Sequence, residues 1–347
     1  MNNVNLTVNG SKYSGWKSIN INLGLEQLSG TFELVVSEKW PDNLTARKMR
    51  PGEACTVDIE GQIIITGYVD DVLPSLDSDS HSVSIKGRDK TGDLVDCSAI
   101  YKTGEWTNKK LDVIAANLCE PFGITVIVNT DIGEPFKKET IQQGETVFEI
   151  LDRLARQRGV LLTSDGLGNL VITRAGNQRL RTVLKEGVNI KTGSGTFSHR
   201  DRYSKYIGQG QHAGDDDFNH ESASEPTAEV TDDAIRYRPL IIIGEDNATI
   251  ETLKKRVTWQ RNINYGRSTN LNIQVVGWIN DRGLLWKFNR SIKVESESLG
   301  ANTELLISNV NYVLDENGTV TNLTLKKAEA YDVLDLPDAS DSESLFG

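Results

Sequence analysis

Alternation of apolar and polar residues is clearest towards the C-terminus. Between Gly266 and Leu334, apolar side chains recur at every second position, and short polar turns separate the runs. A period of two predicts β-strands, and Asn317-Gly318 between two such runs is typical of a tight hairpin. Before them, Ile250, Leu253 and Val257 have helical spacing. We therefore expect a helix over 249–262 and a compact antiparallel unit, which together form a domain over 249–335.

The N-terminal part of the chain shows the same period of two. Short alternating runs are separated by turn residues such as Pro51-Gly52 and Glu60-Gly61. The runs cover 4–8, 18–23, 30–36, 54–59, 63–72 and 82–87. Short strands at this spacing favour a small barrel or sandwich, so we expect a β-barrel domain over 1–95.

The pattern changes to a helical one after residue 95. Leu111, Ile114 and Leu118 have the spacing of one helix face, and Ile150 and Leu154 have that of another. Thr146 and Glu149 fit a capping box at the start of the second helix. Short strands are expected over 124–128, 160–163 and 170–173. Residues 96–182 are thus predicted to form an α+β module.

The segment 183–248 carries the weakest pattern and is predicted to be a connector. Apolar residues near 188–190 and 203–207 suggest two strands. Residues 208–229 are polar and rich in Gly and Asp, which predicts a mobile insertion. The acidic Ser/Asp tail over 336–347 is expected to be disordered.

Two segments of the chain resemble each other. Each contains a strand, a second strand ending in Val-Leu, a polar turn, and a third strand ending near a lysine. The matched runs are 57–59 with 292–294, 72–73 with 313–314, and 83–87 with 323–327. Either duplication or convergent strand patterning explains this similarity. If it is duplication, each chain carries two related barrels.

These patterns define the expected fold class: mainly β, with an α+β module. We expect two small antiparallel β-barrel domains, an α+β domain and a helix-containing insertion. A length of 347 residues suggests two or three domains, and a hydrophobic content of 37% favours small units over one large core. No apolar run approaches the roughly 20 residues of a membrane span, and the N-terminus has no secretory signal pattern.

Charge and cysteine content narrow the possible partners and compartments. A net charge of −11 argues against phosphate binding by the chain as a whole. The same charge is compatible with a surface that lies beside DNA without binding it. Cys55, Cys97 and Cys119 are odd in number and lack CxxC spacing. This argues against a disulfide framework and structural zinc, and indicates a protein made in the cytoplasm.

The residues that could carry chemistry do not form a recognisable catalytic set. The four histidines do not fit a nucleophile–base arrangement, and no G-x-S-x-G elbow is present. Short matches to elements of penicillin-recognising enzymes occur at 14–17, 90–92 and 191–193, without the intervening Ser-Asp-Asn. A metal could be held by the acidic loop residues His212, Asp215, Asp216, Asp217 and His220, but a solvated loop is favoured. We predict no catalytic residue, no cofactor and no metal.

The segment 141–158 suggests an alternative function. Its sequence IQQGETV, followed by the capped helix, is similar to the opening of a LysM peptidoglycan-binding module. A plain strand–turn–capped-helix unit also explains it, and we favour that interpretation. The alternative reading is therefore a peptidoglycan-binding or cell-wall-degrading protein.

A series of landmarks lies near the C-terminus. Its fixed points, which we expect to anchor the fold, are Gly266, Arg267, Gly277, Trp278, Gly283, Trp286 and Asn289. Further landmarks are Ser268, Leu285, the run 305–307 and the closing run 327–331. In order and spacing these landmarks resemble the baseplate hub proteins of contractile phage tails, in particular the Mu-like tail protein and late control protein D types. The resemblance is close over about residues 236–334, and Phe288 departs from it where a proline is expected.

This resemblance implies a structural virion protein without enzymatic activity. Family membership implies a homotrimeric hub at the centre of the baseplate, assembled in the host cytoplasm. It would adapt the six-fold tail tube to the three-fold spike, with the tube protein, the spike protein and other baseplate proteins as partners. DNA would only pass through a central channel. Three chains can match six similar faces only if each chain supplies the face twice.

Overall fold

The structure is a computed structural model that describes residues 4–37, 49–78, 81–176, 178–211, 226–246 and 250–331. The acidic loop with His212 and His220 lies outside these described residues, as does the tail 336–347. In the described part, most of the chain forms strands, which confirms the mainly β character.

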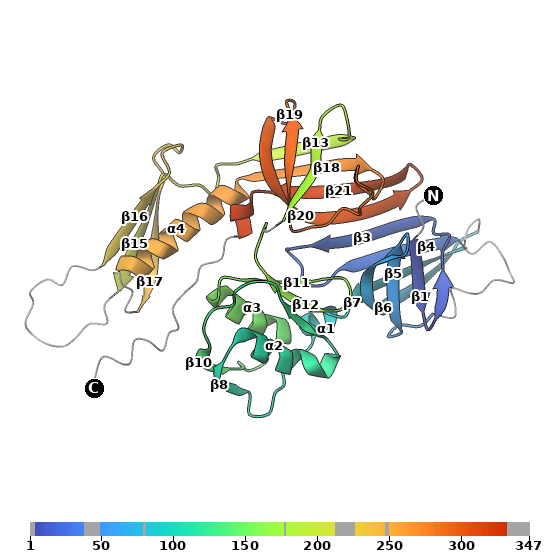
Figure 1. Ribbon diagram of the computed structural model, residues 1–347, viewed down its shortest axis with the longest axis horizontal. Coiled ribbons are helices and arrows are strands. Elements are labelled where there is room, and N and C mark those ends of the chain that lie inside the picture. The colour runs from blue at the N-terminus through green and yellow to red at the C-terminus, as the bar shows by residue number, and fades with distance from the viewer. Residues whose placement is uncertain are drawn as a thin grey trace, which may run out of the picture.

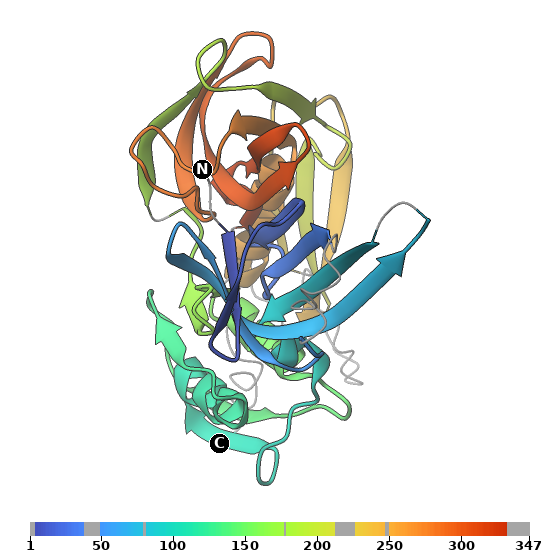
Figure 2. The ribbon, with the colours of Figure 1, turned by 90° about the vertical axis from the view of Figure 1, so that its right-hand side faces the viewer.

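The first β unit is built from the N-terminal strands. Their side chains alternate between buried and exposed, as in β4 and β7, so one face of the sheet packs on the core. The β6–β7 hairpin extends well beyond the neighbouring strands (Figure 2). The strands are β1 (Val4–Val8), β2 (Ser11–Tyr13), β3 (Ser18–Gly24), β4 (Thr31–Ser37), β5 (Ala54–Ile59), β6 (Gln62–Leu76) and β7 (His81–Asp89).

The second β unit is assembled from strands that are far apart in the sequence. One strand crosses the predicted boundary between the module and the connector, one lies in the connector, and the other four come from the C-terminal part of the chain. A short 3-10 helix, η3 (Ala328–Tyr331), follows the last strand. The strands are β13 (Arg179–Lys185), β14 (Thr192–Phe197), β18 (Thr269–Val276), β19 (Arg290–Ser296), β20 (Ala301–Asp315) and β21 (Gly318–Lys326).

The two β units share one sheet. Strand β3 pairs with β20, so the 13-stranded sheet runs β14-β18-β21-β20-β3-β4-β7-β6-β5-β1-β2, with β19 and β13 beside β20. The sequence predicts two separate barrels. The described strands instead join edge to edge, and no described pairing closes either half. The long strand β20 makes this possible because it extends beyond β19, so that part of its edge is left for β3.

Both units follow the same strand order. The first is ordered β1-β5-β6-β7-β4-β3, and the second β13-β19-β20-β21-β18-β14. Both central strands have 15 residues and a register shift midway, near Asp70 and near Ser308. One difference is that β1 pairs antiparallel with β5, whereas β13 pairs parallel with β19. The two similar segments in the sequence therefore occupy the same three positions, β5–β7 and β19–β21.

The α+β module has its own core and lies below the large sheet in Figure 1. Its central helices are confirmed at the positions that the apolar spacing predicts, and Thr146 and Glu149 form the expected capping box. Its elements are α1 (Gly92–Asp96), β8 (Glu105–Lys109), α2 (Leu111–Cys119), η2 (Glu120–Phe122), β9 (Val126–Val128), β10 (Phe136–Thr140), α3 (Val147–Gln157), β11 (Leu161–Ser164) and β12 (Leu170–Thr173).

A third part stands to the side of the sheet, as Figure 1 shows. A three-stranded sheet packs on α4 (Ile250–Arg267), with strands β15 (Lys205–Gln211), β16 (Thr227–Thr231) and β17 (Pro239–Asp246).

The connector differs from expectation in two places. The ends of the predicted mobile insertion 208–229 are paired strands, because Gly208 and Gly210 allow close packing rather than mobility. A Cβ on Gly208 would lie 3.1 Å from Val257 of α4, and one on Gly210 would lie 2.6 Å from Pro226. Near 188–190, where a strand is predicted, residues 187–189 form a turn in which Val188 is exposed.

Candidate assembly surface and its anchors

Gly266 lies where helix α4 meets the closing 3-10 helix. A Cβ at this position would be 2.0 Å from the Ala330 nitrogen and 2.5 Å from its Cα. Only glycine allows the two backbones to approach this closely. The first and last family landmarks are thus in direct contact.

An ionic cluster beside this contact joins the two β units. Lys326 and Tyr331 both donate to Glu26, which lies between β3 and β4. Partial burial acts to raise the pKa of Glu26, but the hydrogen bond and charge of Lys326, helped by Tyr331 and Arg267, hold that pKa below its usual value. Lys327 lies 3.4 Å from the centre of the Tyr265 ring.

Gly277, Trp278 and Gly283 shape the turn after β18. Both glycines have positive φ, +75° and +73°, which favours glycine. The Trp278 side chain is fully buried and donates from Nε1 to the Val313 carbonyl at 3.2 Å. Asn280 closes the turn, because its side-chain oxygen accepts from the backbone of Arg282 and Leu284.

Trp286 is also a core residue. Its ring is 3% exposed, and its carbonyl accepts a hydrogen bond from the buried Tyr312 hydroxyl. Burial raises the pKa of Tyr312, so this hydroxyl stays a donor over the physiological range. The Trp286 Nε1 group is buried and has no hydrogen-bond partner among the described residues.

Asn289 connects the second β unit to the end of the α+β module. Its Nδ2 donates to the Arg174 carbonyl at 3.1 Å, and its Oδ1 accepts from the Gly176 amide at 2.8 Å. Its own amide donates to the Ile307 carbonyl. Its φ of +56° suits asparagine better than most residues. The departure at Phe288 leaves these bonds in place, and that ring packs against the core.

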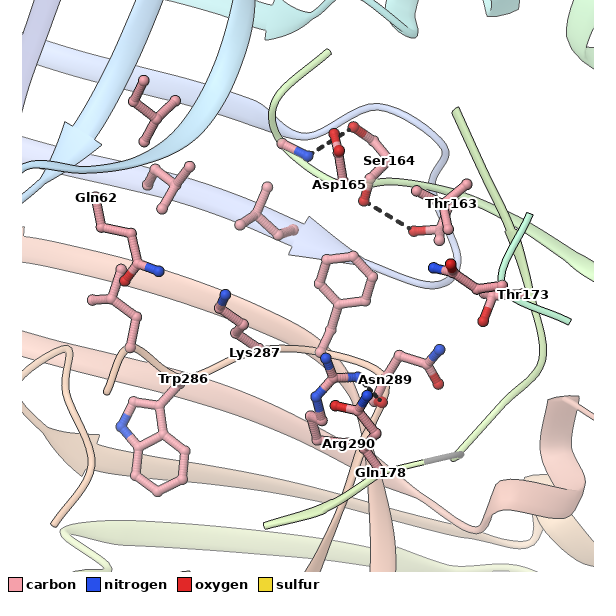
Figure 3. Close-up of a pocket in the computed structure, with 18 of the residues that line it drawn as sticks. Gln62, Thr163, Ser164, Asp165, Thr173, Gln178, Trp286, Lys287, Asn289 and Arg290 are labelled. Carbon is pink, nitrogen blue, oxygen red and sulfur yellow. Dashed lines mark hydrogen bonds between the residues drawn. The ribbon is translucent and has the colours of Figure 1, made fainter. Parts of the chain in front are cut away.

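A cavity of about 510 Å³ lies between the module, the β5–β6 hairpin and the segment 285–290. Figure 3 shows side chains such as Gln62, Thr163 and Lys287 around it. Among the described residues that line it, Asp165 is the one carboxylate, and no histidine or cysteine is present. Both Asp165 oxygens already accept from Asn169, in the β11–β12 turn. The cavity therefore lacks the paired groups that acid–base chemistry needs.

The other residues considered as catalytic candidates make contacts that stabilise the fold or lie exposed on the surface. Thr91, within the Lys-Thr-Gly match, donates from its amide to Asp89 at 2.9 Å, and Gly30 donates to the same carboxylate at 2.7 Å. Burial raises the pKa of Asp89. Among the described histidines, His81 is exposed at the start of β7, and His199 contacts Arg202. In the described residues, no group of acidic, His and Cys side chains could hold a metal ion.

Within the LysM-like stretch 141–158, the apolar face of α3 is buried in the core of the module, with Ile150 and Leu154 fully covered. On its other side, Arg153 bonds to Glu139 and Glu145. These contacts are what a helix inside a folded α+β unit requires, and none of them forms a ligand groove.

The feature that sequence reasoning missed is a continuous polar sheet face. Eight neighbouring strands, from β14 to β6, turn their non-core side chains to one side. Amides and hydroxyls bond across the strands, as in Gln274 to Asn322 at 2.9 Å. The amide residues of this face are Asn20, Asn22, Asn270, Asn272, Gln274, Asn309, Asn311 and Asn322.

Charges on this face are largely paired. Lys86 contacts Glu33 at 3.2 Å, and Arg88 contacts Asp70 at 2.8 Å. Lys326 pairs with Glu26. The face is thus polar and close to electrically balanced, although the whole chain carries a net charge of −11.

Comparison with known proteins places this fold in a family. Residues 3–89 match the model "Mu phage baseplate assembly protein GpP-like, N-terminal". Residues 91–174 match "Baseplate hub protein gp44-like, second domain", and residues 249–334 match the fourth domain of the GpP family. The baseplate hub protein gp44 of Escherichia phage Mu is 34% identical over 340 residues, which cover 95% of this chain and 89% of gp44.

Two solved structures share the architecture. The 43 kDa tail protein of prophage MuSo2 from Shewanella oneidensis superposes with a TM-score of 0.86 and 43% identity, covering 95% of this chain and 99% of that one. A tail protein from Neisseria meningitidis has a TM-score of 0.80 at 23% identity, covering 97% and 99%. In the described residues, no helix is long and apolar enough to span a membrane.

These relatives are structural tail and baseplate proteins rather than enzymes. The landmarks from Gly266 to the closing helix, which suggested this resemblance, lie inside the third matched range. The chain therefore belongs to the family of Mu-like baseplate hub proteins, as a structural component of the virion tail.

Proposed function

We propose that this protein is a homotrimeric hub whose polar sheet face lines a central channel. The observation that carries the proposal is the repeat of one strand order in both β units of a single chain. The seven family landmarks, from Gly266 to Asn289, act as anchors that hold the second unit in place. Each unit supplies four of the strands with the polar face.

The repeat explains how three chains could meet a six-fold partner. A ring of three copies would present six equivalent sheet segments, two from each chain. One side of such a ring could contact a hexameric tail tube, and the other side could contact a trimeric spike. The module 96–182 and the sheet on α4 would then carry contacts with other baseplate proteins.

The polar face suits a channel through which DNA passes. Tight DNA binding needs unpaired lysine and arginine side chains that release counterions. Here Lys86, Arg88 and Lys326 are each paired with a carboxylate. Uncharged amides and hydroxyls would let a polyanion slide without holding it.

The solution mass of the purified protein tests this proposal. Light scattering after size exclusion should give three times 38.4 kDa, unchanged across a dilution series. A persistent monomer would remove the six-fold argument. A peptidoglycan-binding tail protein would instead be retained by cell-wall sacculi, and we expect no retention because the LysM-like helix α3 is part of a closed core.

A further inference from the structure

The junction between the two β units shows how one unit joins the next. Strand β20 is bordered by β19 only up to Ile307, and β3 pairs with the same edge beyond that point. The register places Asn22 opposite Asn311 and Leu23 opposite Val310. Strand β3 thus continues the sheet by pairing with the half of the β20 edge that β19 leaves unpaired.

The same two edges recur at β14, which ends the sheet, and along the second half of β6, where the described strands leave them open. Strand β14 occupies the position of β3 in the second unit, and its only described partner is β18. Strand β6 occupies the position of β20, and beyond Val69 no described residue pairs with its edge on the β5 side. All six residues of β14 are exposed, and Leu73 and Leu76 of β6 are 46% and 74% exposed.

We infer that β14 of one copy pairs antiparallel with the second half of β6 in the next copy, as β3 pairs with β20 inside the chain. This interface rests on the trimer proposed above and names the surfaces that build it. Matching the register of β3 and β20 puts Leu73 opposite Thr196 and Leu76 opposite Gly193. Val72 then lies opposite Phe197.

In this register, the core-side residues of β6 lie opposite core-side residues of β14, and the polar-side residues lie opposite polar-side residues. On the core side, Val72 would meet the ring of Phe197, which is 57% exposed in the isolated chain, and Leu76 would lie over Gly193. On the polar side, Ser75 would lie opposite Ser194 and Leu73 opposite Thr196, so the polar face would continue with a single leucine in it. An open, exposed strand edge otherwise invites uncontrolled pairing, which this contact prevents.

Backbone chemistry limits where the ladder can form. Pro74 has no N–H, so the pair between Pro74 and Gly195 lacks one donor, a position that proteins tolerate in strands at a sheet edge. The contact joins two different surfaces, β14 and β6, so it is head-to-tail. Head-to-tail contacts form a closed ring only when the rotation between copies permits it. Six equivalent junctions, three within chains and three between them, would close the ring of three.

Engineered disulfides test the contact and its register. In a background with the native cysteines replaced by serine, L73C and T196C place two thiols directly opposite each other, within the Cβ spacing of a cross-strand pair. Mild oxidation should give covalent dimers and trimers on a denaturing gel, with no larger species. As a matched control, L76C with T196C shifts the pair by three residues, about 10 Å along the strand, which is too far for a disulfide.

The outcomes separate this interface from the trimer itself. A trimeric mass without crosslinking in L73C/T196C, or equal crosslinking in both pairs, would overturn the interface and leave the trimer standing. A monomeric mass would overturn both. In the wild-type protein, the amides of β14 should exchange with solvent as slowly as those of β3, whose two edges are both paired. Exchange as fast as in the exposed turn 187–189 would also contradict the interface.

Discussion

At the scale of single residues, burial determines which side chains can react and which carboxylates resist ionisation. Cys55 and Cys119 are buried, while Cys97 is exposed. Asp89 is 2% exposed and is surrounded by hydroxyl and amide donors. Sequence alone shows that the cysteines are few and the chain acidic. It cannot show which thiol or carboxylate is covered, because that depends on strands distant in sequence.

The native protein should therefore contain one reactive thiol. Burial raises the pKa of Cys55 and of Cys119 to about 12, which suppresses their thiolates at pH 8. A maleimide or disulfide reagent should label one cysteine per chain before unfolding and three after it. The variant C97S should show none in the native state, and fast labelling of that variant would contradict the burial of the other two.

Asp89 should make stability depend on pH in a specific direction. Because burial raises its pKa in the folded state, the native protein binds the proton more tightly than the unfolded chain. Its contribution to the free energy of unfolding is thus full below the ordinary aspartate pKa of about 3.9 and declines as pH rises through the raised value. The stability advantage of wild type over D89N, measured by denaturant unfolding, should shrink as pH rises. An advantage that grows would contradict the burial effect.

At the scale of elements, sequence patterns predicted the regular parts and missed those set by tertiary packing. The spacing of Leu111 and Leu118 identified α2, and the turn at Asn317 identified the β20–β21 hairpin. Strand β14 was missed because its residues, from Thr192 to Phe197, include two glycines and show no apolar alternation. A Cβ on Gly193 would lie 2.8 Å from Leu299, so its neighbours supply the apolar surface there.

The contact between α4 and η3 should depend on the absence of a side chain at Gly266. In G266A the added methyl group would overlap the backbone of Ala330, which should lower the free energy of unfolding by at least about 1–3 kcal/mol. Thermal or urea unfolding measures this change. K255A, on an exposed position of the same helix, is the control and should change stability by less than about 0.5 kcal/mol. Equal effects of the two substitutions would contradict the claim that the close approach at Gly266 stabilises the fold.

The bridge at Asn289 should hold the end of the α+β module to the second β unit. N289A leaves the Gly176 amide and the Arg174 carbonyl without their side-chain partners and keeps a strained positive φ. A loss of about 1–3 kcal/mol is expected. N302A, at an exposed position in β20, serves as the control. An unfolding free energy for N289A that matches the control would mean that water replaces both bonds.

At the scale of the whole molecule, the repeat was visible in sequence only as three short matches. Val57 to Ile59 and Ile292 to Val294 showed similar strands, but the shared strand order also includes β14, in the connector, and β13, which crosses the predicted boundary between module and connector. The polar face was equally hidden, since its amide residues are scattered from Asn20 to Asn322. Only the pairing of β3 with β20 brings them together.

The most direct test of the two-unit hub is cryo-electron microscopy of the purified protein at a resolution that separates strands. We expect a ring of three chains in which the β3–β20 junction within each chain and the β14–β6 junction between chains alternate around one continuous sheet, with the polar face turned to the channel. A trimer held together elsewhere, with the polar face turned away from the axis, would contradict this account.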